Sequence, residues 1–120
     1  MKIVVCDDSK AMRMIVMRML KQTEYADAEF IQAEDGLQGV AAVKEHEPEL
    51  VLSDWNMPNM SGIDFLRTLR AEGIGVTFGF VTSESTAEMR EIAIKAGASF
   101  TIAKPFTAET FSDVMATTPL

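Results

Sequence analysis

The sequence has one cysteine, one histidine and no long apolar run. A single cysteine cannot form an internal disulfide, so we expect a reducing, cytoplasmic compartment. Cys6 and His46 lie far apart in the chain, which argues against a zinc site. No apolar stretch approaches the roughly 20 residues that cross a bilayer. The acidic pair Asp7-Asp8 also comes too early for a signal peptide, so we expect no contact with membranes.

Positive charge is scarce as well. Eleven lysines and arginines stand against eighteen aspartates and glutamates, which gives a formal net charge of −7. Proteins that bind nucleic acid usually present a basic face, so we do not expect this class of partner. A chain of 120 residues can bury one core but not two. We therefore expect one domain over residues 1–120, monomeric and without a separate effector or DNA-binding domain.

Short apolar runs alternate with segments of helical spacing. The expected strands are residues 2–6, 28–33, 50–53, 76–82 and 99–103. Helices are expected after Ser9, from Leu37 to His46, from Gly62 to Gly73, from Ser85 or Thr86 to Gly97, and around Phe111 to Met115. In the first helix Arg13 falls off the apolar face. This alternation predicts an α/β fold with a doubly wound, five-stranded parallel sheet covered by helices on both faces.

Polar residues stand where these strands end. Asp7 and Asp8 follow the first strand, Asp54 the third, Thr82 closes the fourth and Lys104 follows the fifth. In a parallel sheet these ends share one edge, where ligands bind. Three carboxylates at one edge repel one another. Lys104 supplies one positive charge, and a divalent cation would supply the rest.

Magnesium suits such a site because it prefers carboxylates, carbonyls and water. Asp7 or Asp8, together with Asp54, would bind it, and the backbone carbonyl of Asn56 could add a ligand. An aspartate is an established nucleophile for phosphoryl transfer. Lys104 would stabilise the charge on the phosphoryl oxygens, and Thr82 could hydrogen-bond one of them. Taken singly, each of these residues also fits a helix cap, a turn or a solvated side chain.

Four segments carry a resemblance to a known family. These are Asp7-Asp8, the loop from Ser53 to Gly62, Thr82 and Lys104-Pro105-Phe106. Together they resemble the receiver domain of two-component response regulators, and in particular its stand-alone chemotaxis members. The resemblance implies the strand order 2-1-3-4-5. It also implies that a chemotaxis-type histidine kinase phosphorylates Asp54 with Mg²⁺, and that output follows by phosphorylation-dependent protein binding.

The resemblance assigns further residues to switching and tuning. Asn56 and Glu84 occupy positions that set the lifetime of the aspartyl phosphate, which we expect to be short. Thr82 is the switch hydroxyl, and the small Ser83 beside it permits movement. Pro105 is compatible with a cis peptide bond. Thr101 stands where the family usually has an aromatic switch residue, and Phe100 should point to the opposite face.

The output partner is left open by the sequence. The last helix has Ser112, Asp113 and Val114 where a basic docking residue is expected. The partner is therefore either the flagellar motor switch protein or another target, as in a phosphate sink or an adaptor. A phosphatase is a further candidate partner. Trp55 fits either a ring packed on its loop or a docking contact for kinase or phosphatase.

Two rival functions are weighed against this hypothesis. An aspartate-nucleophile phosphatase of the haloacid-dehalogenase type needs a second aspartate two residues after the nucleophile, where this chain has Asn56. A flavodoxin-like carrier needs a phosphate-binding loop after the first strand, where Asp7 and Asp8 would repel a phosphate. We therefore expect no enzyme in the conventional sense, only self-catalysed phosphoryl transfer and dephosphorylation.

Overall fold

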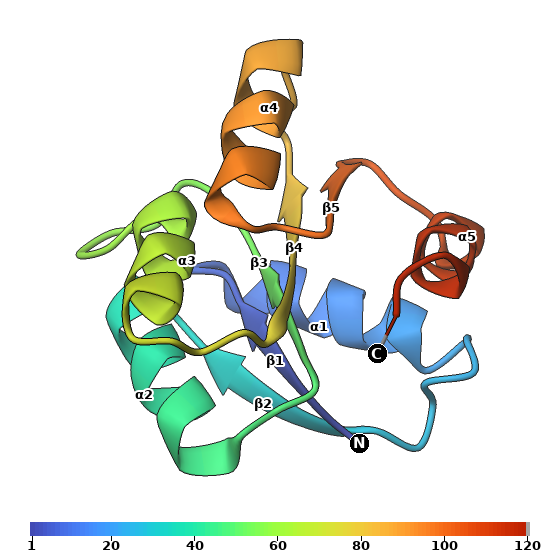
Figure 1. Ribbon diagram of the computed structural model, residues 1–120. Coiled ribbons are helices and arrows are strands. Elements are labelled where there is room, and N and C mark those ends of the chain that lie inside the picture. Colours follow the sequence, from blue (N-terminus) through green and yellow to red (C-terminus); the bar gives the residue numbers. More distant parts are fainter. Residues whose placement is uncertain (120) are drawn as a thin grey trace.

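The computed structural model describes residues 1–119, and Leu120 lies outside the described residues. Five parallel strands lie side by side in the order β2-β1-β3-β4-β5 (Figure 1). The strands are β1 (Lys2–Cys6), β2 (Glu29–Ala33), β3 (Leu50–Ser53), β4 (Thr77–Thr82) and β5 (Phe100–Ala103). The helices are α1 (Lys10–Leu20), α2 (Gly36–His46), α3 (Gly62–Ala71), α4 (Ala87–Ala96) and α5 (Ala108–Ala116). The predicted fold class and strand order are confirmed, with β2, β4 and β5 each beginning one residue later than expected.

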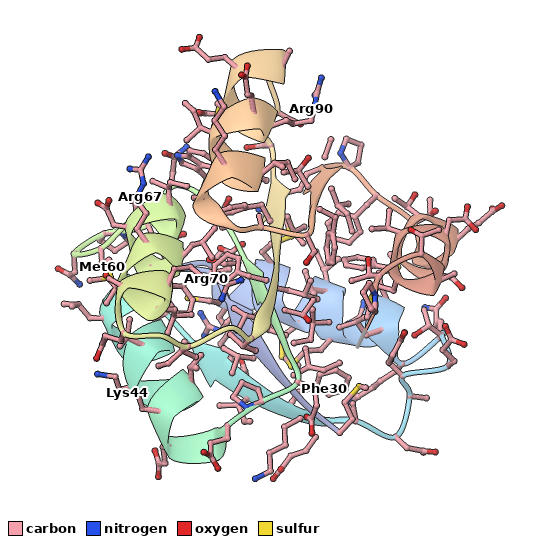
Figure 2. The ribbon with its side chains drawn as sticks, in the orientation of Figure 1. Phe30, Lys44, Met60, Arg67, Arg70 and Arg90 are labelled. Carbon is pink, nitrogen blue, oxygen red and sulfur yellow. The ribbon has the colours of Figure 1, made fainter. Side chains whose placement is uncertain are left out.

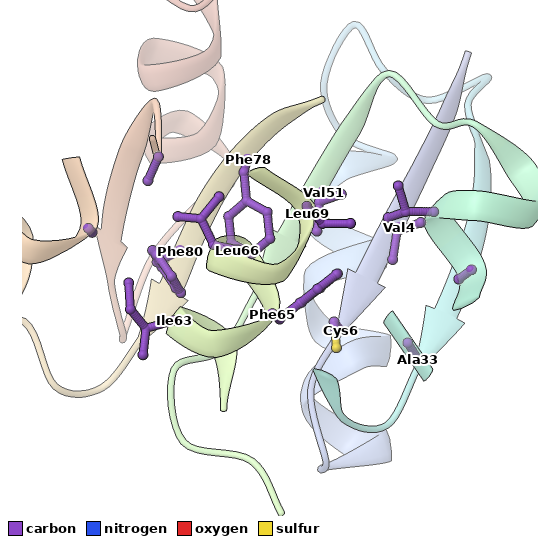
Figure 3. Packing of buried hydrophobic residues seen from close by; sticks show 14 residues of the cluster. Val4, Cys6, Ala33, Val51, Ile63, Phe65, Leu66, Leu69, Phe78 and Phe80 are labelled. Atoms are coloured by element: carbon purple, nitrogen blue, oxygen red, sulfur yellow. The ribbon is translucent and has the colours of Figure 1, made fainter. Parts of the chain in front are cut away.

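Helices cover both faces of the sheet, and each face has its own core. On one face, buried residues of β1, β3 and β4 pack against α2, α3 and α4, and Figure 3 shows Phe65, Phe78 and Phe80 at its centre. On the other face the sheet packs against α1 and α5, with Leu20, Phe111 and Met115 buried. Strands covered on both sides are apolar throughout, which explains the unbroken runs in the sequence. No helix among residues 1–119 has the length and hydropathy to cross a bilayer.

A side-chain cap begins each helix. In every case one side-chain oxygen accepts a hydrogen bond from the backbone N–H three residues ahead, and the caps are Ser9, Asp35, Ser61, Thr86 and Thr107. Such caps satisfy N–H groups that the helix itself cannot. The acids Asp7 and Asp8 therefore do not cap α1, because Ser9 does so. Asp7 Oδ1 accepts a hydrogen bond from the Ser9 N–H at 2.9 Å, and both carboxylates stay at the edge of the sheet.

The expected exposure of Arg13 on the first helix is wrong. Arg13 was expected off the apolar face, yet only 6% of its surface is exposed. Its guanidinium donates to the backbone carbonyl of Asp7 at 2.6 Å and to the side-chain oxygen of Gln32 at 2.9 Å. Helical spacing assigns charged residues to solvent, but these two acceptors compensate the cost of burying the charge. Arg13 therefore connects α1 to the ends of β1 and β2.

Candidate functional site

Strand register brings the chemically active residues to one edge of the sheet. Cys6 pairs with Ser53, and Thr82 pairs with Ala103. The backbone N–H of Asp54 donates to the Cys6 carbonyl at 2.9 Å, and that of Lys104 donates to the Thr82 carbonyl at 2.9 Å. The strands thus end in step, and the first residues beyond them are neighbours. This confirms the shared edge that the alternation of strands and helices predicts.

Three carboxylates meet at this edge. One oxygen each of Asp7, Asp8 and Asp54 lies within 4.8 Å of the others. Lys104 Nζ lies 3.2 Å from Asp7 Oδ2 and 3.5 Å from Asp54 Oδ2. Asp7 is buried, whereas Asp8 is exposed and opens the cluster to solvent. The site therefore concentrates negative charge. The ammonium group of Lys104 contacts Asp7 and Asp54, the two less exposed acids.

The donor set fits a magnesium ion. Carboxylate oxygens are the ligands that Mg²⁺ prefers, and it commonly keeps several waters, for which the exposed Asp8 side leaves access. The single charge of Lys104 cannot neutralise three carboxylates, and a divalent cation would complete the charge balance. Asn56 is exposed in the loop two residues after Asp54. Its carbonyl as a further ligand stays a prediction.

The loop after Asp54 is held close to the acid. The Trp55 N–H donates to Asp54 Oδ1 at 2.8 Å, and the Gly62 N–H donates to the Trp55 carbonyl at 2.8 Å. The indole ring of Trp55 packs on Phe80 with ring centroids 4.8 Å apart. Trp55 is half-buried against the α2–α4 core. The Trp55 ring therefore packs on β4, and its role as a docking contact stays a prediction.

Thr82 and its neighbours lie at the end of β4. Thr82 is buried, and its hydroxyl oxygen accepts a hydrogen bond from the Glu84 N–H at 3.2 Å. Ser83 and Glu84 are exposed. The peptide bond between Lys104 and Pro105 is cis. The switch and tuning roles of these residues stay predictions, but their positions around the edge agree with them.

The fifth strand presents Thr101 in place of an aromatic ring. Thr101 is half-buried and pairs with Phe80 of β4. The Phe100 side chain packs on the opposite face, in the α1–α5 core, and its ring lies over Gly79. A Cβ atom at Gly79 would overlap that ring, so glycine is needed there. Phe100 therefore cannot take over the aromatic role from Thr101 without leaving its core.

An apolar groove adjoins the acidic site. It has a volume of about 510 Å³ and is lined by Met12, Ile15, Ser83, Lys104, Pro105 and Phe106. Lys104 thus belongs to both the groove and the acidic site. A molecule seated in this groove would touch the same lysine that contacts Asp7 and Asp54.

The sequence did not reveal three residues that support the site, namely Arg13, Asp35 and Asn59. Arg13 reaches the Asp7 carbonyl, as described above. Asp35 is buried and accepts a hydrogen bond from the Asn59 side chain at 2.7 Å. The hydrogen bond from the Gln38 N–H, together with the one from the Asn59 side chain, holds the pKa of Asp35 below its usual range. An acidic residue directly before a helical glycine was the available signal, since aspartate is a favoured N-cap.

Cys6 shows the inert environment expected of a buried strand residue. Burial raises the pKa of its thiol to about 12. The thiol donates to the Asp35 carbonyl at 3.2 Å. Because the thiolate is the reactive form, we expect Cys6 not to act as a nucleophile at neutral pH.

Comparison with known proteins agrees with this geometry. Residues 3–116 match the family model described as the response regulator receiver domain. The chain is 36% identical over 115 residues to chemotaxis protein CheY-3 of Vibrio cholerae, covering 94% of this chain and 87% of the relative. It is 31% identical to chemotaxis protein CheY of Pseudomonas aeruginosa, covering 94% and 91%.

Solved structures show the same fold. The chemotaxis protein CheY4 of Vibrio cholerae superimposes with a TM-score of 0.85 at 27% identity, covering 96% of this chain and 95% of that one. The receiver domain of Thermotoga maritima CheB superimposes with a TM-score of 0.82 at 26% identity, covering 97% and 94%. The likeness therefore extends over nearly the whole chain.

The rival functions give way to this match. The phosphatase and the carrier require other residues at Asn56 and after β1, and neither is a receiver domain. The cluster of Asp7, Asp8 and Asp54 is typical of a receiver's magnesium and phosphorylation site. A receiver domain implies a histidine kinase as its partner and is not a conventional enzyme. The chain belongs to the response regulator receiver domain family, with CheY-like relatives.

Proposed function

We propose that this protein is a stand-alone, cytoplasmic response regulator, one receiver domain over residues 1–120, whose Asp54 is phosphorylated by a histidine kinase in the presence of Mg²⁺. The observation that carries the proposal is the meeting of Asp54 with two further carboxylates and Lys104 at one sheet edge. A phosphoryl-acceptor site accounts for three carboxylates at one edge with Lys104 against two of them. Asp54 is the acid that the loop to α3 holds directly.

The reaction moves a phosphoryl group from nitrogen to oxygen. A carboxylate oxygen of Asp54 forms a bond to phosphorus, and the bond from phosphorus to the imidazole nitrogen of the donor breaks. The electron pair of that bond leaves with the imidazole, which takes up a proton. When bound at Asp7, Asp8, Asp54 and the Asn56 carbonyl, Mg²⁺ supplies charge neutralisation for the transferred group. Lys104 Nζ, which lies 3.5 Å from Asp54 Oδ2, stabilises the negative charge on the phosphoryl oxygens.

Thr82 links the phosphoryl group to the rest of the protein. Its hydroxyl accepts from Glu84 N–H, so its own proton is available for a phosphoryl oxygen. Ser83 and Glu84 precede α4, and a displaced Thr82 would carry this segment with it. The signal then leaves through α4, β5 and α5, with Thr101 in place of the aromatic switch. This is a local charge change that biases a two-state element.

Chemotaxis is the setting that the named relatives support. Chemotaxis proteins of Vibrio cholerae and Pseudomonas aeruginosa are 36% and 31% identical to this chain, and each match covers 94% of it. We propose a chemotaxis-type histidine kinase as donor, docking along the apolar groove that shares Lys104 with the site. The exposed charges Glu88, Arg90, Glu91 and Lys95 on α4 define the output face. A phosphatase is a further partner.

Removal of Mg²⁺ should abolish phosphorylation. With a small phosphodonor and Mg²⁺ we expect one phosphoryl group per molecule, and with a chelator in excess we expect background labelling, because three carboxylates then repel the incoming anion. In a second experiment the protein is labelled in Mg²⁺ and the phosphodonor is then removed. While Mg²⁺ is present the label should decay quickly, as Asn56 and Glu84 imply. Phosphate analysis by intact mass measures both. Equal labelling with and without the chelator would contradict the need for Mg²⁺. A label stable for hours in Mg²⁺ would contradict the short lifetime of the aspartyl phosphate.

The output partner can be tested by a pull-down. Immobilised flagellar motor switch protein is mixed with this protein, with and without a phosphate mimic such as beryllofluoride. If the motor is the target, retention should rise with the mimic, because the mimic favours the phosphorylated state of α4 and β5. Retention that does not change with the mimic favours the alternative of a phosphate sink or adaptor. Binding to the kinase serves as the positive control.

A further inference from the structure

The loop that carries the phosphorylation site is tied to the start of α2. Asp35 caps α2 through one carboxylate oxygen, which accepts from the Gln38 N–H at 2.8 Å. Its other oxygen accepts from the Asn59 side-chain amide at 2.7 Å. Beside this bond the Gly36 N–H donates to the Met60 carbonyl at 3.1 Å. Figure 2 labels Met60 where the loop before α3 passes the start of α2.

The approach of the two segments is close enough to require particular residues. A Cβ atom on Gly36 would lie 2.6 Å from the Met60 side chain, so only glycine lets the backbones meet. Asn59 has a φ of 64°, a left-handed conformation that asparagine tolerates better than most residues. The contact is therefore built on both sides, by a glycine that opens the space and an asparagine that accepts the turn.

The same contact reaches the acidic pair. The carbonyl of Asp35 accepts from the Cys6 thiol, directly before Asp7, and Cys6 Sγ lies 3.5 Å from Met57 Sδ of the loop. Asp7 N–H donates to the Ala33 carbonyl at 3.1 Å. The end of β1, the start of α2 and the loop after Asp54 thus converge. Asn56 lies in the part of this loop between its attachment at Trp55 and the contact at Asn59.

We propose that Asp35 and Asn59 are positioning residues for phosphoryl transfer, whose hydrogen bond holds the loop after Asp54 in the geometry that binds Mg²⁺ and presents the Asp54 carboxylate. Neither residue touches the phosphoryl group. The inference rests on the proposed function, since it names what prepares that site. Residues that orient the ligands of a metal site commonly change metal affinity when they are removed.

The bond can be removed from either side with little other change. Asp35→Ser keeps an oxygen to cap α2 but is too short to reach Asn59. Asn59→Gly keeps the left-handed turn but removes the amide. A matched control is Ala41→Gly, which weakens α2 at an exposed position away from the loop. Urea unfolding of all variants shows whether each one folds and how much stability it loses.

The decisive measurement is Mg²⁺ affinity by calorimetry, together with the labelling rate from a small phosphodonor. We expect Asp35→Ser and Asn59→Gly each to bind Mg²⁺ about tenfold more weakly than wild type, as for other residues behind a metal site. Their double variant should be no weaker than either single one, because both remove the same bond. Ala41→Gly should bind as wild type does. Affinities of all variants equal to Ala41→Gly would overturn the proposal.

A charge exchange gives a second, independent test. Asn59→Asp alone sets two carboxylates where a 2.7 Å hydrogen bond now joins the pair, so Mg²⁺ affinity should fall. Adding Asp35→Asn restores an amide and a carboxylate with their places exchanged, and affinity should recover. Failure to recover would count against positioning by this bond. Wild-type protein that binds Mg²⁺ but takes no label would refute the proposed function, while the affinities still decide the role of the pair.

Discussion

Asp54→Asn should abolish labelling by a small phosphodonor and Mg²⁺. The amide has the size of the carboxylate but lacks the charge that makes its oxygen a nucleophile. Trp55 N–H can still donate to the amide oxygen, so the loop keeps its attachment. We expect label at background level, measured by intact mass, and a free energy of unfolding within about 1 kcal/mol of wild type.

Asp64→Asn is the matched control for this substitution. Asp64 is an exposed carboxylate in the first turn of α3, close in sequence but outside the acidic cluster. It should be labelled as wild type is, which shows that the loss of an arbitrary carboxylate near the loop has no effect. Equal labelling of Asp54→Asn and wild type would refute Asp54 as the acceptor and move attention to Asp7 and Asp8.

Gly62→Ala should give the largest loss of stability at the site. A Cβ atom at Gly62 would overlap the carbonyl oxygen of Asp54 and press on the Phe80 ring. The overlapping partner is backbone, which cannot rotate away as a side chain would. Overpacking of this kind costs about 3 kcal/mol. We expect that loss in urea unfolding, with a fall in Mg²⁺ affinity because Asp54 must move.

Gly75→Ala separates this steric cause from a general effect of losing a glycine. Nothing lies within 4 Å of a Cβ atom at Gly75, and the residue is exposed. Its free energy of unfolding should therefore stay within about 0.5 kcal/mol of wild type. If Gly62→Ala is as stable as Gly75→Ala, the close packing of the loop on Asp54 is wrong.

The strands, the helices and their buried faces could be predicted from the sequence because the core is regular. Buried parallel strands are apolar throughout, and each helix shows one apolar face, so strand ends and helix faces could be located. Once the strands are parallel, their ends must share an edge, and Asp7, Asp54 and Lys104 follow from that alone. The meeting of these groups is therefore a consequence of topology.

The supporting residues could not be read in the same way. Arg13 and Asp35 are charged, and spacing rules place charged residues in solvent. Their burial depends on partners from other segments of the chain: the Gln32 side chain for Arg13 and the Asn59 amide for Asp35. Such pairings arise only when the strands have assembled. They also hold the parts of the chain next to the acidic cluster, so polar groups around this site are the ones that periodicity misses.

Thr101 marks the other limit of sequence reasoning. The structure places it on β5 beside Phe80, with Phe100 committed to the opposite core. An output that depends on a swinging ring at this position is therefore not available to this chain. Under the proposed function, movement of Thr82 and of the segment before α4 is expected to carry a larger share of the signal, and the pull-down with the motor switch protein tests this.

Reductive trapping can locate the phosphoryl group on Asp54. Borohydride reduces an aspartyl phosphate to homoserine, which marks the residue permanently for peptide sequencing by mass spectrometry. After incubation with phosphodonor and Mg²⁺, we predict homoserine at position 54 and unchanged aspartate at positions 7 and 8. Homoserine at position 7 or 8, or none at position 54 in labelled protein, would contradict the account.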